Sequence, residues 1–206
     1  MAGKPTTPSE NLSISQPAEA TTSPAPQMID ISRIQPYEHN PRHGRNPEYD
    51  RIRDSIRNTG LDQPLVVTQR PDVSDFIVHA GGNTRLIILK ELFDETGDPR
   101  FAAVPCLLKP WCCESDVLLA HLRENDLRGG LTFIDKARAV CEAQKLLAEE
   151  LGLDVISQRR LETELRRAGY RITQGRISQM VYTVYRLLPV IPIALEGGLG
   201  RPHVER

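Results

Sequence analysis

The chain has 206 residues, and its 26 Lys and Arg against 27 Asp and Glu give a formal net charge of −1 at neutral pH. This length suits one or two globular units with a buried core, and the balanced charge argues against a generally polycationic protein. The sequence has no run of about 18 apolar residues and no basic-then-apolar start, so it predicts neither a membrane span nor secretion. The four cysteines lack CxxC spacing, and we expect a reduced, cytoplasmic protein without disulfides.

The N-terminal segment differs from the rest of the chain. Its first 27 residues hold five Pro, eight Ser or Thr and no aromatic residue. Such a composition buries too little apolar surface to offset the entropy of ordering. The sequence therefore predicts a disordered tail over residues 1–28.

Short strand and helix patterns alternate over the following segment, residues 29–123. A helix over residues 47–60 begins at a proline and ends at a glycine. Another helix follows Gly81-Gly82 and ends near Gly97. The expected strands are residues 29–34, 64–69, 76–80 and 104–108.

From Glu114 on, the apolar residues recur at helical spacing. A long helix is expected over residues 133–151, then a shorter one that ends at Gly169, then one with Thr173 as its N-cap. We therefore predict an α+β protein with two domains after the N-terminal tail. A small α/β domain at 29–123 precedes an all-α domain at 124–196, and a C-terminal tail follows at 197–206.

The last two of these helices form a candidate helix-turn-helix, a motif whose second helix enters the DNA major groove. Residues 157–188 hold seven Arg and only two acidic residues. Gln and Arg can form bidentate hydrogen bonds with base edges, and Arg also binds phosphates. An ordinary helical hairpin with a basic solvent face is the alternative interpretation. The candidate DNA-binding residues are Arg159, Arg160, Arg171, Thr173, Gln174, Arg176, Ser178 and Gln179.

A second candidate site lies between a predicted strand and the helix after it. Glycines let a ligand approach the backbone, and a helix N-terminus offers free N–H groups to an anion. Some 40 residues later, a carboxylate and an amide could serve Mg²⁺ together with phosphate oxygens. A simple turn and separate surface residues are the alternative. The candidate nucleotide-binding residues are Gly81, Gly82, Thr84, Arg85 and Arg128, and the candidate metal ligands are Glu124 and Asn125.

The order of these segments resembles the ParB family of bacterial partition proteins, which share a fold with sulfiredoxins. Four boxes carry the resemblance over residues 29–190: Asn-Pro-Arg at 40–42, Gln-Pro-Leu-Val-Val at 63–67, Gly-Asn-Thr-Arg at 82–85 and Glu-Asn-Asp-Leu-Arg at 124–128. The C-terminal stretch, 187–202, is similar to ParB-family proteins of integrating conjugative elements.

The resemblance implies an N-terminal domain that binds CTP and Mg²⁺ and a DNA-binding domain after it. Gly82 and Arg85 would hold the triphosphate, Arg128 would line the nucleotide site, and Glu124 and Asn125 would lie by the metal. Asn83 and Thr84 stand where the family has Glu and Arg. This departure argues against tight binding or hydrolysis of CTP.

The sequence thus predicts a sequence-specific DNA-binding protein, switched by CTP, for partition or maintenance of a chromosome, plasmid or integrating conjugative element. The implied partners are double-stranded DNA, a ParA-type ATPase and a second copy in a homodimer, with no membrane, on the bacterial nucleoid. The alternatives are an enzyme, either a ParB-like nuclease or a CTPase, and an adaptor that keeps only the fold.

Overall fold

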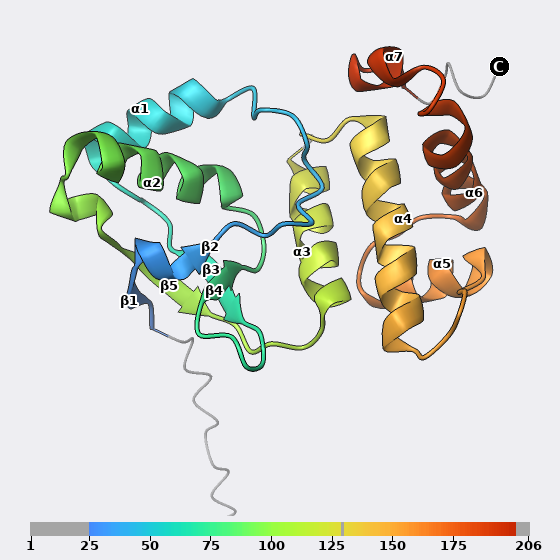
Figure 1. The fold of residues 1–206 in the computed structure, drawn as a ribbon, viewed down its shortest axis with the longest axis horizontal. Helices are drawn as coiled ribbons and strands as arrows, with labels where there is room; N and C mark the ends of the chain where they lie inside the picture. Colours follow the sequence, from blue (N-terminus) through green and yellow to red (C-terminus); the bar gives the residue numbers. More distant parts are fainter. Residues whose placement is uncertain (1–24, 129, 201–206) are drawn as a thin grey trace, which may run out of the picture.

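The computed structural model describes residues 25–128 and 130–200 (Figure 1). Most of the predicted disordered tail, residues 1–24, and the end of the predicted C-terminal tail, residues 201–206, lie outside the described residues. Among the described residues, no helix combines the length and apolar character needed to cross a membrane.

A five-stranded mixed sheet forms the first part, in the order β1-β5-β3-β4-β2. β1 pairs antiparallel with β5 and β3 with β4, whereas β3 and β5, and β2 and β4, run parallel. The strands are β1 (Gln27–Asp30), β2 (Ile34–Gln35), β3 (Leu65–Gln69), β4 (Phe76–Val78) and β5 (Ala103–Leu108).

The predicted strand over residues 29–34 is wrong in detail, because a 3-10 turn, η1 (Ile31–Arg33), divides it. Asp30 causes the break, since its side chain accepts a hydrogen bond from the Ser32 amide at 2.8 Å. β1 also starts two residues before the predicted end of the tail, because Gln27 and Met28 pair with β5.

Two helices, α1 (Tyr49–Thr59) and α2 (Asn83–Thr96), pack side by side over this sheet (Figure 1). A short 3-10 helix, η2 (Pro99–Phe101), leads from α2 into β5. The core between sheet and helices is aliphatic, with Leu65, Val67, Leu86 and Leu89 almost fully buried. The predicted helices of this part are confirmed, and both end at the expected glycines.

The second part is all helical and has its own core. Its elements are α3 (Glu114–Leu127), α4 (Phe133–Glu150), α5 (Gln158–Arg167), α6 (Gln174–Tyr182), the π-helical turn η3 (Thr183–Leu187) and α7 (Pro192–Glu196). The predicted α+β class, with an α/β part before an all-α part, is therefore confirmed.

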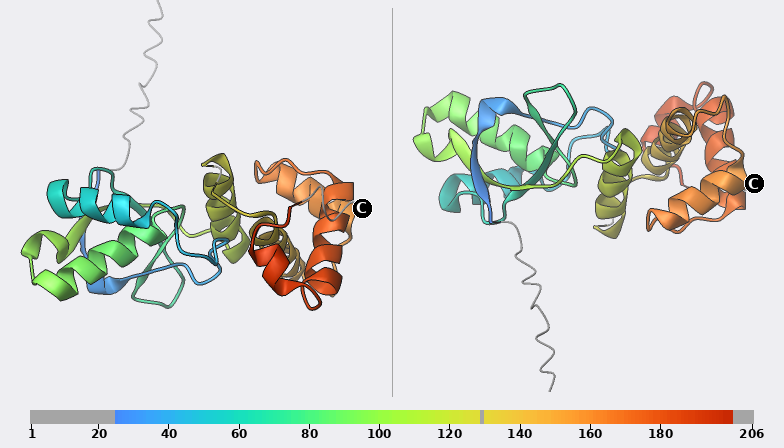
Figure 2. Two further views of the ribbon diagram at one scale, coloured as in Figure 1. Left: turned by 90° about the horizontal axis from the view of Figure 1, so that it is seen from above. Right: turned by 90° about the horizontal axis from the view of Figure 1, so that it is seen from below.

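Helix α3 lies between the two parts, as both views of Figure 2 show. Its apolar residues Val117, Leu118 and Leu122 belong to the helical core. The predicted boundary between residues 123 and 124 falls inside this continuous helix. The helix contacts the sheet side as well, where His121 Nε2 donates to the Val78 carbonyl at 2.9 Å. Any change that moves α3 is thus felt by both parts.

Candidate functional site

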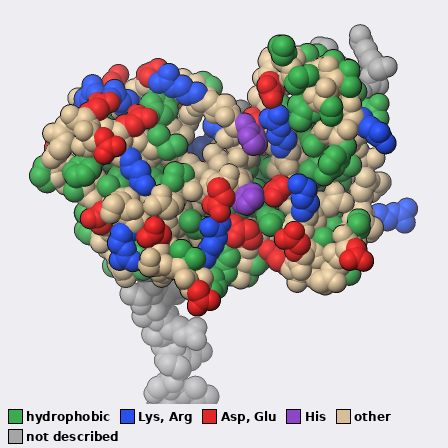
Figure 3. Space-filling model, viewed as in Figure 1, with side chains coloured by type: hydrophobic (Ala, Val, Ile, Leu, Met, Phe, Trp, Pro, Cys, Tyr) green, Lys and Arg blue, Asp and Glu red, His purple; other side chains and the backbone are tan. Residues whose placement is uncertain are grey.

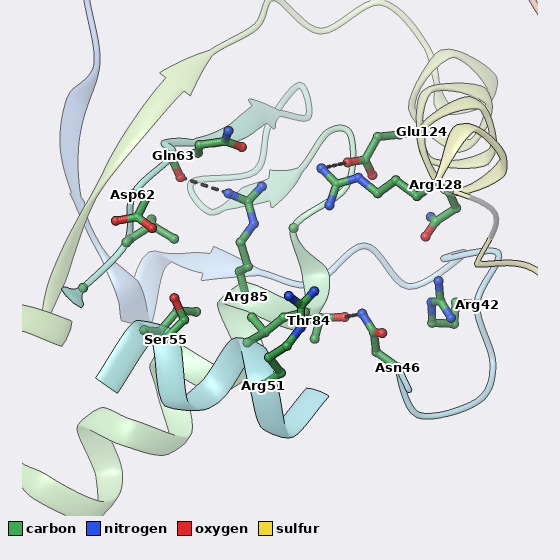
Figure 4. A pocket seen from close by; sticks show the side chains of 16 residues that line it. Arg42, Asn46, Arg51, Ser55, Asp62, Gln63, Thr84, Arg85, Glu124 and Arg128 are labelled. Atoms are coloured by element: carbon green, nitrogen blue, oxygen red, sulfur yellow. Dashed lines mark hydrogen bonds and ion pairs between the residues drawn. The ribbon is translucent and has the colours of Figure 1, made fainter. Parts of the chain in front are cut away.

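A pocket of about 350 Å³ opens between α1, the start of α2 and the end of α3 (Figure 4). Four of the residues that line it are arginines and two carry carboxylates. The excess of positive charge favours an anionic ligand. These charged residues are Arg42, Arg51, Arg85, Arg128, Asp62 and Glu124.

Gly82 lines the pocket at the start of α2, whereas the predicted residue Gly81, which precedes it, does not. Gly82, at the N-cap position, has a φ of +94°, and Gly81 has a φ of +52°, a region that favours glycine. A Cβ at Gly81 would collide with the Glu124 carboxylate, so this glycine also lets α3 approach. The first helical bond runs from Leu86 N to Gly82 O, and the earlier amides of α2 are the donors that a helix start offers to an anion.

Arg85 reaches across the pocket from the first turn of α2 and donates to the Gln63 carbonyl at 2.9 Å (Figure 4). Burial lowers the pKa of its guanidinium, the positive charge of Arg128 lowers it further, and Glu124 partly opposes both. A bound anion would relieve this electrostatic cost, because it would supply the negative charge that the arginines lack.

Arg128 is paired instead with Glu124, at 2.5 Å, and its side chain is 63% exposed. Asn125 also lines the pocket and donates its Nδ2 to the His121 carbonyl at 2.9 Å, which directs its Oδ1 away from that carbonyl. The two predicted metal ligands therefore lie together at the pocket, but a cation there must compete with Arg128 for the carboxylate.

The two residues that depart from the family's box behave differently. Thr84 lines the pocket, and its hydroxyl accepts from Asn46 Nδ2 at 3.4 Å. Asn83 is buried and exchanges two hydrogen bonds of 3.1 Å with the backbone of Tyr37. Asn83 thus fixes the loop after β2 and does not line the pocket.

A group with metal-ligand geometry lies elsewhere among the described residues, at Glu38, His39 and Glu114. Arg70 binds both of these carboxylates, at 2.5 and 2.7 Å. The guanidinium therefore already occupies both carboxylates, and we assign no metal to the group.

The second candidate region is the helix-turn-helix formed by α5 and α6. A broad groove of about 850 Å³ lies at the start of α6. Four of the eight predicted DNA-binding residues line it: Arg171, Thr173, Arg176 and Gln179. Arg166 and Gly175 line it too and were not predicted.

The other four predicted residues lie outside this groove. Arg159 and Arg160 are exposed on α5, and Ser178 is exposed on α6. Gln174 donates its Nε2 to Gln158 Oε1 at 2.8 Å, a contact inside the motif. Their side chains are therefore not all gathered at one point.

The predicted capping role of Thr173 is only half right. Thr173 occupies the N-cap position of α6, but its side chain makes no capping hydrogen bond. The Gln174 amide donates instead to Glu162 Oε2 of α5, at 3.1 Å. A carboxylate from the preceding helix thus satisfies the start of α6, which sequence spacing alone could not reveal.

Two of the cysteines and the tryptophan behave as packing residues. Cys106 and Cys141 are buried, and burial raises the pKa of each thiol to about 11. Trp111 packs on the helical core. None of these residues lines the anion pocket or the groove at α6.

Comparison with known proteins agrees with this architecture. The model of the family described as ParB N-terminal domain matches residues 15–125, more than half of the chain. No curated protein matches the sequence significantly.

Two solved structures with TM-scores above 0.5 share this fold at low sequence identity. The C2221 form of a pNOB8-like ParB N domain is 14% identical, with a TM-score of 0.57 over 81% of this chain and 76% of that one. Another pNOB8-like ParB N-domain structure is 14% identical, with a TM-score of 0.56 over 82% and 68%. ParB from Caulobacter crescentus, complexed to the centromeric parS site, is 18% identical, with a TM-score of 0.44 over 84% and 78%. On the family match and the shared fold, the chain belongs to the ParB N-terminal domain family.

Proposed function

We propose that this protein binds duplex DNA in a sequence-specific way through α5 and α6. The observation that carries the proposal is the groove at the start of α6, where Arg166, Arg171 and Arg176 converge with the helix N-terminus. Guanidinium groups and helix N-termini are the groups that hold DNA phosphates, and the first residues of a recognition helix contact base edges. Gln179, one turn along α6, supplies a side chain suited to adenine.

The local charge supports the same proposal. Residues 165–195 hold five Arg and no Asp or Glu. A stretch of this kind attracts a polyanion although the whole chain is near neutral. On the face that Figure 3 shows, acidic and basic side chains are interspersed over the α/β part.

We further propose that the pocket beside α2 binds a nucleoside triphosphate, CTP with Mg²⁺, that switches DNA binding. The pocket fits a polyphosphate, because it combines four arginines with a glycine-rich helix start. Glu124 and Asn125 would hold the metal, which would also need phosphate oxygens as ligands. When bound, Mg²⁺ would neutralise phosphate charge and free Arg128 from Glu124.

The cellular role follows from family membership and remains a proposal. It is partition or maintenance of a chromosome, plasmid or integrating conjugative element, with a ParA-type ATPase and a second copy of the chain as partners. The site residues support DNA binding more directly than they support either enzymatic alternative.

The test of DNA binding is selection from a random duplex library, with and without CTP and Mg²⁺, followed by salt titration of the selected duplex. We expect Arg176→Ala to weaken binding and to reduce the slope of log affinity against log salt by about one. Arg57→Ala, on α1 and outside the groove, is the matched control and should bind as the wild type does. No duplex binding above background at low salt would overturn the proposal.

Calorimetry with CTP and Mg²⁺ tests the nucleotide site separately. We expect the wild type to bind and Arg85→Ala to bind at least about tenfold more weakly, because a charge-assisted hydrogen bond is lost. Arg100→Ala, an exposed arginine outside the pocket, is the control. Equal heats for the wild type and Arg85→Ala would remove Arg85 from the site.

A further inference from the structure

Glu162 of α5 lies behind the groove at the start of α6 and holds two groups that a DNA phosphate would use. Its Oε2 accepts from the Gln174 amide at 3.1 Å, and its Oε1 binds Arg166 Nη2 at 2.6 Å. The Glu162 side chain is 22% exposed and that of Arg166 is 64% exposed. The carboxylate of Glu162 thus binds both an amide donor at the start of α6 and an arginine that lines the groove.

The chemistry of this carboxylate is that of a phosphate. Both are anions that accept from a helix N-terminus and pair with a guanidinium. Thr173 occupies the N-cap position, but its own side chain makes no capping hydrogen bond. Glu162 is therefore the side chain that accepts from the start of α6, at the Gln174 amide. A phosphate that docks at Arg166 must therefore displace a competitor belonging to the protein itself.

We infer that Glu162 is a specificity-determining residue, which competes with DNA phosphates and so weakens binding to non-cognate duplexes. The inference rests on the proposed DNA binding by α5 and α6. Non-specific binding comes almost entirely from phosphate contacts, whereas a cognate site adds base contacts. A random-sequence complex depends on this phosphate contact and meets the penalty in full, whereas a cognate complex is held by its base contacts and can leave Arg166 paired with Glu162.

The neighbouring carboxylate provides a matched control. Glu164, two residues later in α5, pairs with Arg167 at 3.1 Å, and its side chain is 19% exposed. Among the described residues, Arg166 lines the groove and Arg167 does not. Glu162→Gln and Glu164→Gln therefore change the net charge equally, and only the first releases a groove arginine. The glutamine at 162 keeps an oxygen that can still accept from the Gln174 amide.

The experiment measures binding of both variants to two duplexes over a range of salt concentrations. One duplex is about 30 base pairs of random sequence, and the other is the duplex selected from the library. We expect Glu162→Gln to bind the random duplex about threefold more tightly than Glu164→Gln, in line with the strength of a half-exposed ion pair. Its slope of log affinity against log salt should be steeper by about one phosphate contact. The ratio of selected to random affinity should fall.

A double variant, Glu162→Gln with Arg166→Gln, should return the slope to the wild-type value, because the released cation is gone. Far-UV circular dichroism and thermal midpoints check that all variants are folded. Equal affinities and slopes for Glu162→Gln and Glu164→Gln, or weaker binding of Glu162→Gln to both duplexes, would overturn this inference while DNA binding stands. Failure of the wild type to bind either duplex would instead overturn the proposed function, and this inference with it.

Discussion

At the scale of single residues, Gly81 is a point where a side chain of α3 lies against the backbone of the α/β part. The Glu124 carboxylate lies where a side chain at this position would begin. Glu124 is also the partner of Arg128 in the anion pocket. Gly81 therefore serves two requirements at once: a positive φ in the turn before α2, and space for a charged group of the pocket.

Replacing Gly81 by Ala should destabilise the protein more than backbone strain alone requires. Gly97 offers the comparison, because it also has a positive φ, +64°, but nothing lies within 4 Å of a Cβ there. We expect Gly97→Ala to lower the free energy of unfolding by about 1 kcal/mol, and Gly81→Ala by about 0.5 kcal/mol more, because the flexible Glu124 side chain must move away and give up its exposed ion pair with Arg128. Urea unfolding of the two variants measures the difference, and equal losses would show that moving Glu124 costs no stability.

The sequence predicted several of the polar residues that line the pocket, but it assigned only two of the four arginines to the site. Thr84, Arg85, Glu124 and Arg128 stand in boxes whose order the sequence displays. Arg42 stands in the Asn-Pro-Arg box but was assigned to no site, and Arg51 was assigned no role. Their place in the pocket depends on how the loop after β2 and helix α1 pack on the sheet, which local spacing does not encode.

At the scale of elements, the helix starts of the second part are built in two different ways. Thr132 and Asp135 form a capping box at α4, with the Asp135 amide donating to Thr132 Oγ1 at 3.2 Å and Thr132 Oγ1 donating to the Asp135 carboxylate at 2.9 Å. α6 has Thr173 in the same position without a side-chain cap. One helix start is thus satisfied by its own residues and the other by a distant carboxylate.

This difference predicts unequal costs for the same substitution. Thr132→Ala should lower the free energy of unfolding by about 1 kcal/mol, the usual cost of a lost N-cap. Thr173→Ala should cost less than about 0.5 kcal/mol, because Glu162 keeps its bond to the Gln174 amide. Chemical unfolding of both variants gives the comparison. A larger loss for Thr173→Ala would mean that the Thr173 hydroxyl stabilises α6 after all, against the absence of a capping hydrogen bond from its side chain.

The elements that the sequence predicted best are those with periodic apolar faces and glycine or proline at their ends. α1, α4 and α5 are of this kind, and all three lie where they were expected. The short edge strand β2 and the π-helical turn η3 were missed, because two or five residues carry no period. β2 takes its form from its pairing with β4, a tertiary contact, and η3 is closed by a local bond from the Leu188 amide to the Thr183 carbonyl.

At the scale of the whole molecule, two cores meet along α3, and two buried histidines lie at the junction. His79 pairs with Asp116 at 3.0 Å, and His121 stacks on Tyr37 with ring centres 4.9 Å apart. The Nδ1 atoms of both histidines are buried without a hydrogen-bond partner among the described residues. The junction is therefore built for neutral imidazoles.

The protein should consequently lose stability in mild acid. Burial lowers the pKa of His121 to about 4, although the Val78 carbonyl opposes the change, and burial likewise lowers the pKa of His79 despite the hydrogen bond that His79 donates to Asp116. Because these pKa values lie below the ordinary value near 6.5, the unfolded chain binds more protons, and the free energy of unfolding falls as the pH drops from about 6.5 towards 4. Protonation of His121 alone should lower the free energy of unfolding by on the order of 3 kcal/mol across that range.

Urea midpoints at several pH values test this expectation. His121→Gln should flatten the profile of stability against pH, because the glutamine amide can still donate to the Val78 carbonyl but takes up no proton. His43→Gln, at an exposed position, should retain the wild-type slope. A profile of His121→Gln as steep as that of the wild type would place the acid sensitivity outside the junction, and the two cores would then separate for a reason other than the charging of a buried imidazole.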